Sequence, residues 1–219
     1  MYTGPNITTD GLVLALDAAN SKSYVSGSAT WFDLSGNGLN GSQSGSVFPS
    51  YNSSNNGNLI FTNNSPINIG NSSILNLTNL TLSVWFKTTS TGNQQLIAKN
   101  YTTSYYLNVA PGGNTFSLWT NGSELGSSGI TTLGNGNWHN ITATMSGTTK
   151  TIYYDSLQVG TNTGTIPAVD SFNLVIGNTG GANPNPFNGS MGNVLVYNRA
   201  LSALEVLQNY NGQKSRFNL

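Results

Sequence analysis

The side chains that could carry acid–base chemistry in this chain are few: 7 carboxylates and 1 histidine in 219 residues. Retaining hydrolysis of a glycosidic bond needs two carboxyl groups about 5–5.5 Å apart. The glutamates do not offer such a pair, since Glu124 is expected in a turn and Glu205 in a helix cap. No two aspartates stand two positions apart, where one strand face would hold both. We therefore expect no glycosidase activity and no enzyme.

His139 is the single histidine, and the chain has no cysteine. Nothing around any serine is typical of a nucleophile elbow. Strand periodicity places His139 on one face with Ile141, Ala143 and Met145, which indicates a hydrogen-bonded histidine at the edge of the core. A zinc site would need three carboxylates beside it and is disfavoured.

The segment from Asp33 to Gly38 is the best candidate for a metal site. Asp33, Ser35 and Asn37 place oxygen atoms at alternate positions before a glycine, as at the start of a calcium loop. An EF-hand would need a bidentate glutamate at the twelfth position, where Ser44 stands. The alternative is a turn in which Asp33 and Asn37 bond their own backbone. Calcium on Asp33 and Asn37 and a metal-free turn both stay open, and no other cofactor is expected.

Aromatic side chains are the remaining candidates for ligand contact. Sugars stack on exposed Tyr or Trp rings, with amides and hydroxyls nearby. Tyr101 and Tyr105 flank a polar segment and are the first predicted ligand-binding residues, and Gly180–Pro186 is a candidate functional loop. The full set of candidate platforms is Trp31, Tyr51, Tyr101, Tyr105, Trp119 and Tyr153.

Short β-type runs separated by Gly, Asn and Ser clusters must position these side chains, and this pattern is typical of a β-sandwich. Leu80–Lys87 alternates apolar and mostly polar residues, which predicts a strand buried on one face. The predicted strands are Leu12–Asp17, Asn58–Thr62, Leu80–Lys87, Gln95–Lys99, Ser104–Ala110, Thr115–Asn121, Trp138–Met145, Lys150–Asp155, Asn173–Gly177 and Met191–Asn198.

One helix is predicted, from about Ser202 to Asn209. Ser202 and Glu205 form a capping box, and Leu201 and Val206 are spaced as a hydrophobic staple. Gly212 is expected to end the helix in a left-handed turn. We also expect the leucines at 204 and 207 to pack on the core, because they are spaced i, i+3.

Several of these segments together resemble the laminin-G-like, concanavalin A-like jelly-roll domains. Phe187–Tyr210 is similar to the closing strand and helix, and Gly136–Thr144 to the strand that begins with Trp-His. Gly11–Asn20 and Trp31–Gly38 are similar to the opening of these domains. The resemblance implies an all-β fold, a two-sheet antiparallel jelly-roll sandwich with one short C-terminal helix. It also implies a rim calcium on Asp33 and Asn37, and one domain over residues 1–219 with an arm at 1–10.

The opening segments and the tail segments Asn198–Ser202 and Leu207–Asn211 are most similar to the version of this domain found in structural proteins of tailed bacteriophages. That resemblance implies a non-catalytic virion protein: a capsid decoration or cement protein, or a fibre subunit. Its partners would be phage capsid or tail proteins, in a homo-oligomer or symmetric assembly. The alternative is a carbohydrate-binding adhesion module that recognises host surface glycans.

Charge is scarce, since 6% of residues are charged and the net charge is zero. Such a chain has little long-range attraction for nucleic acid or an anionic membrane, and neither is an expected partner. The N-terminus lacks a basic segment before its short apolar run, so we expect no signal peptide. The expected localisation is the virion, after synthesis in the host cytoplasm.

Overall fold

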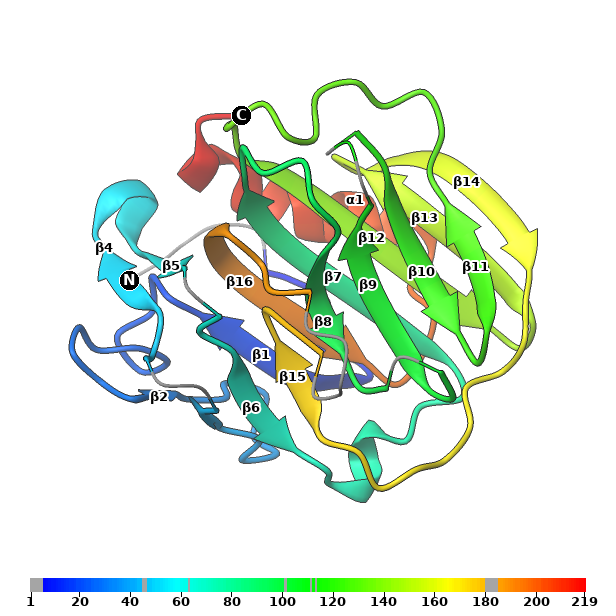
Figure 1. The fold of residues 1–219 in the computed structure, drawn as a ribbon, viewed down its shortest axis with the longest axis horizontal. Coiled ribbons are helices and arrows are strands. Elements are labelled where there is room, and N and C mark those ends of the chain that lie inside the picture. Colours follow the sequence, from blue (N-terminus) through cyan, green and yellow to red (C-terminus); the bar gives the residue numbers. More distant parts are fainter. Residues whose placement is uncertain are drawn as a thin grey trace.

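The computed structural model describes residues 6–44, 47–62, 64–100, 102–110, 112, 114–179 and 185–219. The strands in these ranges form two antiparallel sheets that pack face to face, with one α-helix on the outer side of one sheet (Figure 1). The predicted all-β sandwich with a short C-terminal helix is therefore confirmed. The part of the chain that the structure describes holds no helix long and apolar enough to cross a membrane.

Sheet A has the strand order β14-β13-β12-β7-β16-β5-β4, and β1 also pairs with β16. Register places Leu12 opposite Tyr197, so the first strand of the sandwich pairs with the last. The strands are β1 (Leu12–Asp17), β4 (Ser50–Asn52), β5 (Asn58–Phe61), β7 (Leu80–Lys87), β12 (His139–Ser146), β13 (Thr149–Tyr154), β14 (Leu157–Thr163) and β16 (Gly189–Tyr197).

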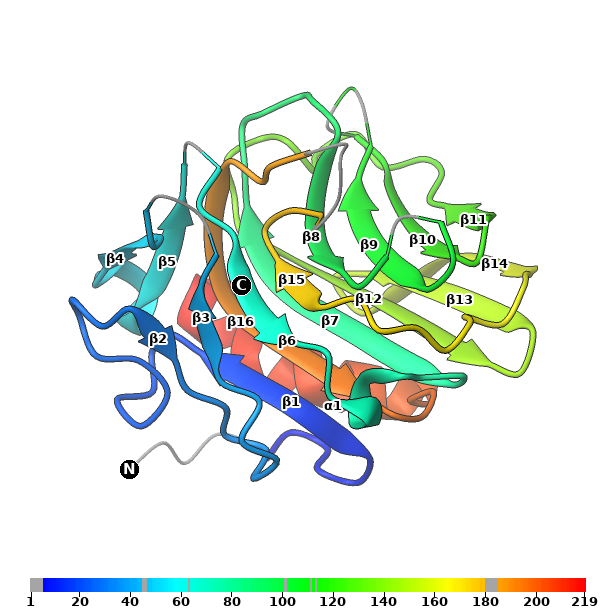
Figure 2. The ribbon, with the colours of Figure 1, turned by 60° about the horizontal axis from the view of Figure 1, so that its bottom comes forward.

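Sheet B has the order β11-β10-β9-β8-β15-β6-β3-β2. Figure 2 shows β8 to β11 of this sheet facing β7, β12 and β13 of sheet A. The strands are β2 (Thr30–Trp31), β3 (Gly41–Gln43), β6 (Ile67–Gly70), β8 (Gln94–Ala98), β9 (Tyr105–Val109), β10 (Phe116–Thr120), β11 (Ser123–Gly126) and β15 (Leu174–Ile176). Short 3-10 turns at η1 (Ser54–Asn56) and η2 (Ser73–Leu75) connect strands.

The core lies between the two sheets. Leu82, Val84 and Phe86 of β7 belong to the same buried cluster as Leu107 and Leu118 of sheet B. Alternate residues of a strand point to opposite faces, so each strand contributes every second side chain to this layer. Burying such side chains contributes roughly 1.5–3 kcal/mol each before the entropy of ordering is subtracted.

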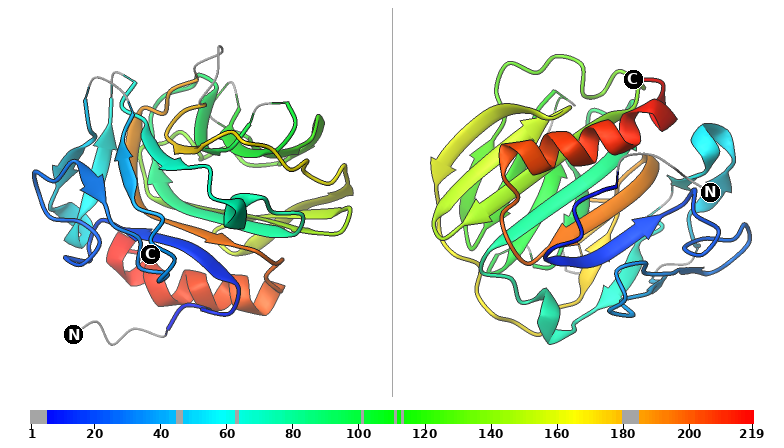
Figure 3. Two further views of the ribbon diagram at one scale, coloured as in Figure 1. Left: turned by 90° about the horizontal axis from the view of Figure 1, so that it is seen from below. Right: turned by 180° about the vertical axis from the view of Figure 1, so that it is seen from behind.

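Both faces of β7 are buried, which corrects the expectation of a strand buried on one side only. The outer face is covered by helix α1 (Ala203–Gln213) and by the 3-10 turn η3 (Lys214–Phe217), as Figure 3 shows from behind. The Trp85 ring stacks on Phe217 with ring centroids 4.3 Å apart, and its Nε1 donates to Gln213 over 2.7 Å. Alternation alone could not reveal that a distant segment returns to cover this face.

The start of α1 follows its sequence signals. Both hydrogen bonds of the capping box between Ser202 and Glu205 are present. Leu201 and Val206, the predicted staple pair, belong to one buried cluster.

The packing face of α1 was predicted wrongly, because Leu204 is 79% and Leu207 42% exposed. The helix turns Val206, Asn209 and Gly212 to the sheet instead. Asn209 makes this contact specific, because its Oδ1 accepts from the Thr8 N–H over 2.8 Å and its Nδ2 donates to a tyrosine hydroxyl at the end of β16.

The prediction that Gly212 ends the helix was also wrong. Gly212 lies inside α1 and is buried. The chain continues from Gln213 into η3 without a left-handed residue at this point.

Candidate functional site

The outer face of sheet B carries a transverse line of side chains. Trp119 of β10 stands opposite Tyr106 of β9, which stands opposite Ala98 of β8. Ala98 in turn faces Val175 of β15, and Val175 faces Asn68 of β6. Their neighbours along each strand belong to the core, so these five side chains point outward. We call them the sheet B row.

An aromatic pair forms one end of the sheet B row. The rings of Trp119 and Tyr106 stack with centroids 5.6 Å apart and planes 10° from parallel. Trp119 keeps part of its surface in contact with solvent, whereas Tyr106 is 3% exposed beneath it. Trp119 is therefore the accessible member of the pair, and its ring, held in place by Tyr106, can stack on a ligand ring.

Buried amide groups lie one step along the strands from this aromatic pair. Gln95 of β8 stands opposite Asn108 of β9. Gln95 is fully buried, and neither its Nε2 nor its Oε1 has a hydrogen-bond partner in the described structure. Asn108 donates to Asn93 over 3.0 Å, while its Oδ1 is also unpaired. Each unpaired buried group costs about 1–3 kcal/mol, and these amide atoms have no surface that a ligand could reach in this arrangement.

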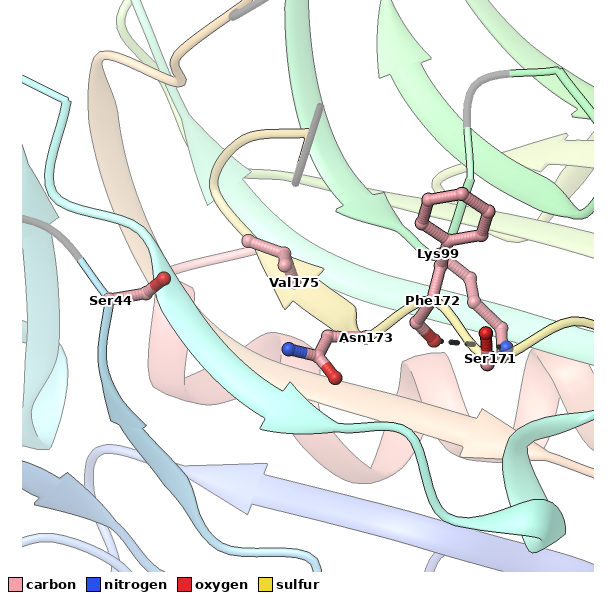
Figure 4. Close-up of a pocket in the computed structure, with 6 residues that line it drawn as sticks. All are labelled: Ser44, Lys99, Ser171, Phe172, Asn173 and Val175. Carbon is pink, nitrogen blue, oxygen red and sulfur yellow. Dashed lines mark hydrogen bonds between the residues drawn. The ribbon is translucent and has the colours of Figure 1, made fainter. Parts of the chain in front are cut away.

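The other end of the sheet B row opens into a pocket of about 250 Å³ (Figure 4). Val175 belongs to both the row and the pocket wall. Phe172 is 53% exposed at its edge, so an aromatic face is accessible here too. The lining residues are Ser44, Lys99, Ser171, Phe172, Asn173 and Val175.

A buried ion pair holds the loop that forms one wall of the pocket. The Lys99 side chain has no exposed surface, and its Nζ donates to the Asp170 carboxylate. The same Nζ donates to the carbonyl oxygens of Asp170 and Phe172, over 3.2 and 3.0 Å. Lys99 therefore fixes the backbone from which the Phe172 ring projects.

Comparison with known families identifies the fold. Residues 61–207 match a laminin G family described as the concanavalin A-like lectin/glucanases superfamily. The chain belongs to this family. It therefore has a lectin-like fold. A search of curated protein sequences found no match.

Three similar structures illustrate the range of lectin-like proteins that share the fold. The binding domain of Paraclostridial Mosquitocidal Protein 1 has a TM-score of 0.69 and 16% identity, over 92% of this chain and 52% of that chain. The binding domain of botulinum neurotoxin DC, in complex with SialylT, has a TM-score of 0.62 and 14% identity, over 93% and 52%. Domain 4 of an extracellular arabinanase from Geobacillus stearothermophilus, in complex with arabinotriose, has a TM-score of 0.69 and 15% identity, over 91% and 98%. The chain thus spans about half of each toxin binding domain, and identities this low show the fold alone.

Tyr105 does not have the exposed position that sequence analysis gave it. It begins β9, is fully buried between the sheets, and donates from its hydroxyl to the Leu75 carbonyl over 3.0 Å. Burial, followed by the charge of Asp170, raises the pKa of the Tyr105 hydroxyl far above its ordinary value. Its prediction as an accessible sugar platform was therefore wrong. Tyr101 lies outside the described residues, as do residues 180–184 of the candidate loop.

The other aromatic candidates separate clearly by burial. Trp31 lies in the core between the sheets, and Tyr51 packs against that core. Tyr153 is buried on the outer side of sheet A, in the cluster that includes Val206 of α1. Trp119 alone of the five described candidates lies on the outer face of sheet B.

Tyr106, Gln95 and Phe172 were not among the predicted site residues. Tyr106 could have been found from alternation, because Leu107 and Val109 fix the core face of β9 and Tyr105 shares that face. Gln95 was hidden by an irregular register between Gln95 and Ile97. Phe172 lies in a loop, and no periodic signal marks it.

The Asp33 loop is organised as a turn in this member of the family. Asp33 Oδ1 accepts from the N–H groups of Ala15 and Ser35, both over 2.9 Å. Asp33 Oδ2 accepts from the Ser35 hydroxyl over 2.7 Å and from the Leu39 N–H over 3.1 Å. Asn37 directs its Nδ2 to the Val13 carbonyl over 3.0 Å. This donor set fits the turn alternative better than a cation, and calcium stays a prediction.

His139 makes the contacts of a hydrogen-bonded histidine at the core edge. It is 8% exposed, and its Nδ1 lies 2.9 Å from the Asp155 carboxylate and 2.7 Å from the Tyr154 hydroxyl. Its Nε2 lies 3.3 Å from Asn135 Oδ1. The described residues contain no group of three or more His, Cys, Asp or Glu side chains that could hold a metal ion.

The two glutamates have different structural roles. Glu124 lies on β11 rather than in the turn that was expected, and accepts from the Ser117 hydroxyl over 2.6 Å. Glu205 caps α1, and its ion pair with the Arg199 guanidinium lowers the pKa of the carboxyl to about 2. A group with so low a pKa is a poor general acid at neutral pH.

Proposed function

We propose that the chain is a non-catalytic lectin-like module that binds an oligosaccharide on the outer face of sheet B, in contact with Trp119. One observation carries the proposal: Trp119 stays partly exposed on the outer face of sheet B, where its ring stacks on the buried Tyr106. Sugar rings have apolar C–H faces that stack on aromatic rings, and hydroxyl groups that bond amides.

The surroundings of the row support a polar, uncharged ligand of extended shape. The row crosses β10, β9, β8, β15 and β6. Adjacent strands are about 4.8 Å apart, so these five strands span the length of several sugar rings. The arabinotriose complex of the similar arabinanase domain supports a glycan as the ligand of this fold.

Binding to a glycan array, followed by calorimetry with the best ligand, tests the proposal. Trp119→Ala should weaken binding about tenfold or more, as the loss of a central aromatic contact commonly does. Leu204→Ala is the matched control, because Leu204 is 79% exposed on the helix behind sheet A. Equal affinity in both variants would place the site elsewhere. A folded chain that binds no glycan at all would remove the proposal.

A second candidate is a structural subunit of a tailed-phage virion, bound to capsid or tail proteins in a symmetric assembly. The resemblance of Asn198–Ser202 and Leu207–Asn211 to phage structural proteins supports it. Leu204 and Leu207 add an observation, because both expose apolar surface on α1, on the opposite side of the sandwich from the sheet B row. Exposed leucines on one helix face can pack against another protein.

The two candidate functions predict opposite effects for substitutions on the two faces. Leu204→Ser with Leu207→Ser should abolish association with purified phage particles and leave glycan affinity unchanged, while Trp119→Ala should do the reverse. Association with particles should also change little with salt, because the chain has only 7 basic and 7 acidic residues. Failure of the wild-type chain to bind particles would remove the virion candidate.

A further inference from the structure

The charge of the sheet B face bears on which glycans it can accept. All 7 Lys and Arg residues of the chain lie in the described ranges. Lys99 lines the pocket, and none of the other six belongs to a strand of sheet B or to the pocket wall. Lys150 of β13 reaches β11, where its Nζ donates to the carbonyl oxygen of Ser123 over 2.9 Å, next to Glu124, but its side chain is buried. A carboxylate or sulfate on a sugar is usually held by a cation, most often a bidentate arginine.

Lys99 cannot supply that cation in this arrangement. An ammonium group has three N–H donors, and Lys99 directs its own to the Asp170 carboxylate and to the carbonyls of Asp170 and Phe172. Its side chain has no exposed surface, and its charge is balanced by Asp170, whose side chain is 10% exposed. The pocket therefore presents a structural lysine rather than a free positive charge.

Negative charge lies at the opposite end of the row. Glu124 stands opposite Trp119 in the register of β11 with β10, and its side chain reaches the outer face because it accepts from Ser117. Glu124 is exposed. An anionic sugar stacked on Trp119 would be repelled by this carboxylate.

The pocket itself offers groups that suit one neutral sugar ring. Phe172 gives an aromatic edge, and Asn173, Ser171 and Ser44 give amide and hydroxyl groups around it (Figure 4). Its volume of about 250 Å³ is below the range of roughly 300–1,000 Å³ that drug-sized ligands occupy. One ring fits such a space, while the rest of a chain would extend toward Trp119 over Ala98 and Tyr106, which are buried and offer it no side-chain contact.

We propose that the ligand is an uncharged oligosaccharide whose end residue occupies the Phe172 pocket, and that acidic glycans are excluded. This inference rests on the proposed glycan-binding function and names its ligand class. Acidic glycans are excluded because Lys99 of the pocket is paired with Asp170, and because the Glu124 carboxylate lies beside Trp119.

Matched glycan pairs test the ligand class. Each pair consists of a neutral oligosaccharide and the same oligosaccharide carrying one terminal sialic acid, printed on one array. The neutral member should bind, and the sialylated member should bind at least tenfold more weakly. The affinity for the neutral member should be the same in low and high salt, since no ion pair contributes. Equal or stronger binding of sialylated members would overturn the inference while leaving the glycan-binding function intact. Absence of all glycan binding would overturn both.

Point variants test the pocket. Phe172→Ala should weaken binding of the neutral glycan about fivefold or more. Val169→Ala is the matched control, because Val169 belongs to the same loop, is 72% exposed and does not line the pocket. Full affinity in Phe172→Ala together with loss in Trp119→Ala would show that the row binds the glycan without the pocket, which overturns the end-residue assignment.

Discussion

The two outer faces of this sandwich begin from the same kind of side chain and are used differently. On sheet A, Trp85 is sealed beneath Phe217 and Tyr210, which the C-terminal segment brings to it. On sheet B, Trp119 stacks on its strand neighbour Tyr106 and stays partly exposed. The first tryptophan completes the fold, whereas the second is free to contact a ligand. Aromatic content alone therefore does not locate a binding face, because a ring can contact a ligand only where no other segment covers it.

The largest expected effect is on the sealed face. Phe217→Ala should lower the free energy of unfolding by about 3–5 kcal/mol, because the ring is 3% exposed between Trp85 and Trp138. Truncation after Tyr197, which removes α1 and η3 together, should prevent a cooperative transition. Urea unfolding followed by tryptophan fluorescence measures both. A truncated chain that melts like the full chain would show that sheet A does not need its cover.

The second-largest effect on stability is expected in the Asp33 loop. Asp33→Ala leaves the N–H groups of Ala15, Ser35 and Leu39 without their acceptor and should cost about 1.5–3 kcal/mol. In the turn alternative, a chelator leaves the melting temperature of the wild type unchanged. If the loop binds calcium, chelation lowers that temperature, the shift grows with free calcium, and Asp33→Ala removes the response.

The open face should tolerate truncation better than the sealed one. Trp119→Ala should cost about 0.5–1.5 kcal/mol of stability, the value of a stacked pair, while removing glycan binding. Calorimetric melting beside the binding assay separates the two quantities. A loss of stability as large as that of Phe217→Ala would mean that Trp119 is a structural residue and that the two faces do not differ in the way described.

The smallest effect concerns the cap of α1 and depends on pH. The pKa of Glu205 is lowered to about 2 by Arg199 and by its bonds to Ser202. The carboxylate therefore stabilises the fold above its ordinary pKa of about 4.5, and this contribution is lost as pH falls from there toward 2. Glu205→Gln should be less stable than the wild type at neutral pH, and the difference should shrink through this acid range. A difference that stays constant with pH would show that the amide caps the helix equally well.

Local signals predicted the elements that depend on local chemistry. The bounds of β1 and β7 match the predicted Leu12–Asp17 and Leu80–Lys87, because each is a run of mainly apolar, strand-forming residues. The capping box also followed directly from Ser202 and Glu205. Strands such as β2 and β3, with 2 and 3 residues, carry too little periodicity to be read and were missed.

The site was harder to predict because the exposure of each aromatic side chain depends on which distant segments pack over it. Tyr105 and Tyr106 are adjacent in β9, so Tyr105 points into the core and Tyr106 points to the outer face of sheet B. The helix face was mistaken for a similar reason. Asn209, a polar residue, makes the buried contact through hydrogen bonds to the N-terminal segment and to β16, while the two leucines remain outside.

The pairing of β1 with β16 also governs when the chain can fold during synthesis. Leu12 can pair with Tyr197 only after β16 has been synthesised, and β16 is the strand that links β1, β7 and β5 into one sheet. Contacts this distant along the chain make folding slow, because a long loop must close before they form. Until residues 189–197 leave the ribosome, the apolar Val13, Leu14 and Leu16 have no partner strand. Chains interrupted before that point would expose these residues and aggregate, so the yield of this protein depends on complete translation.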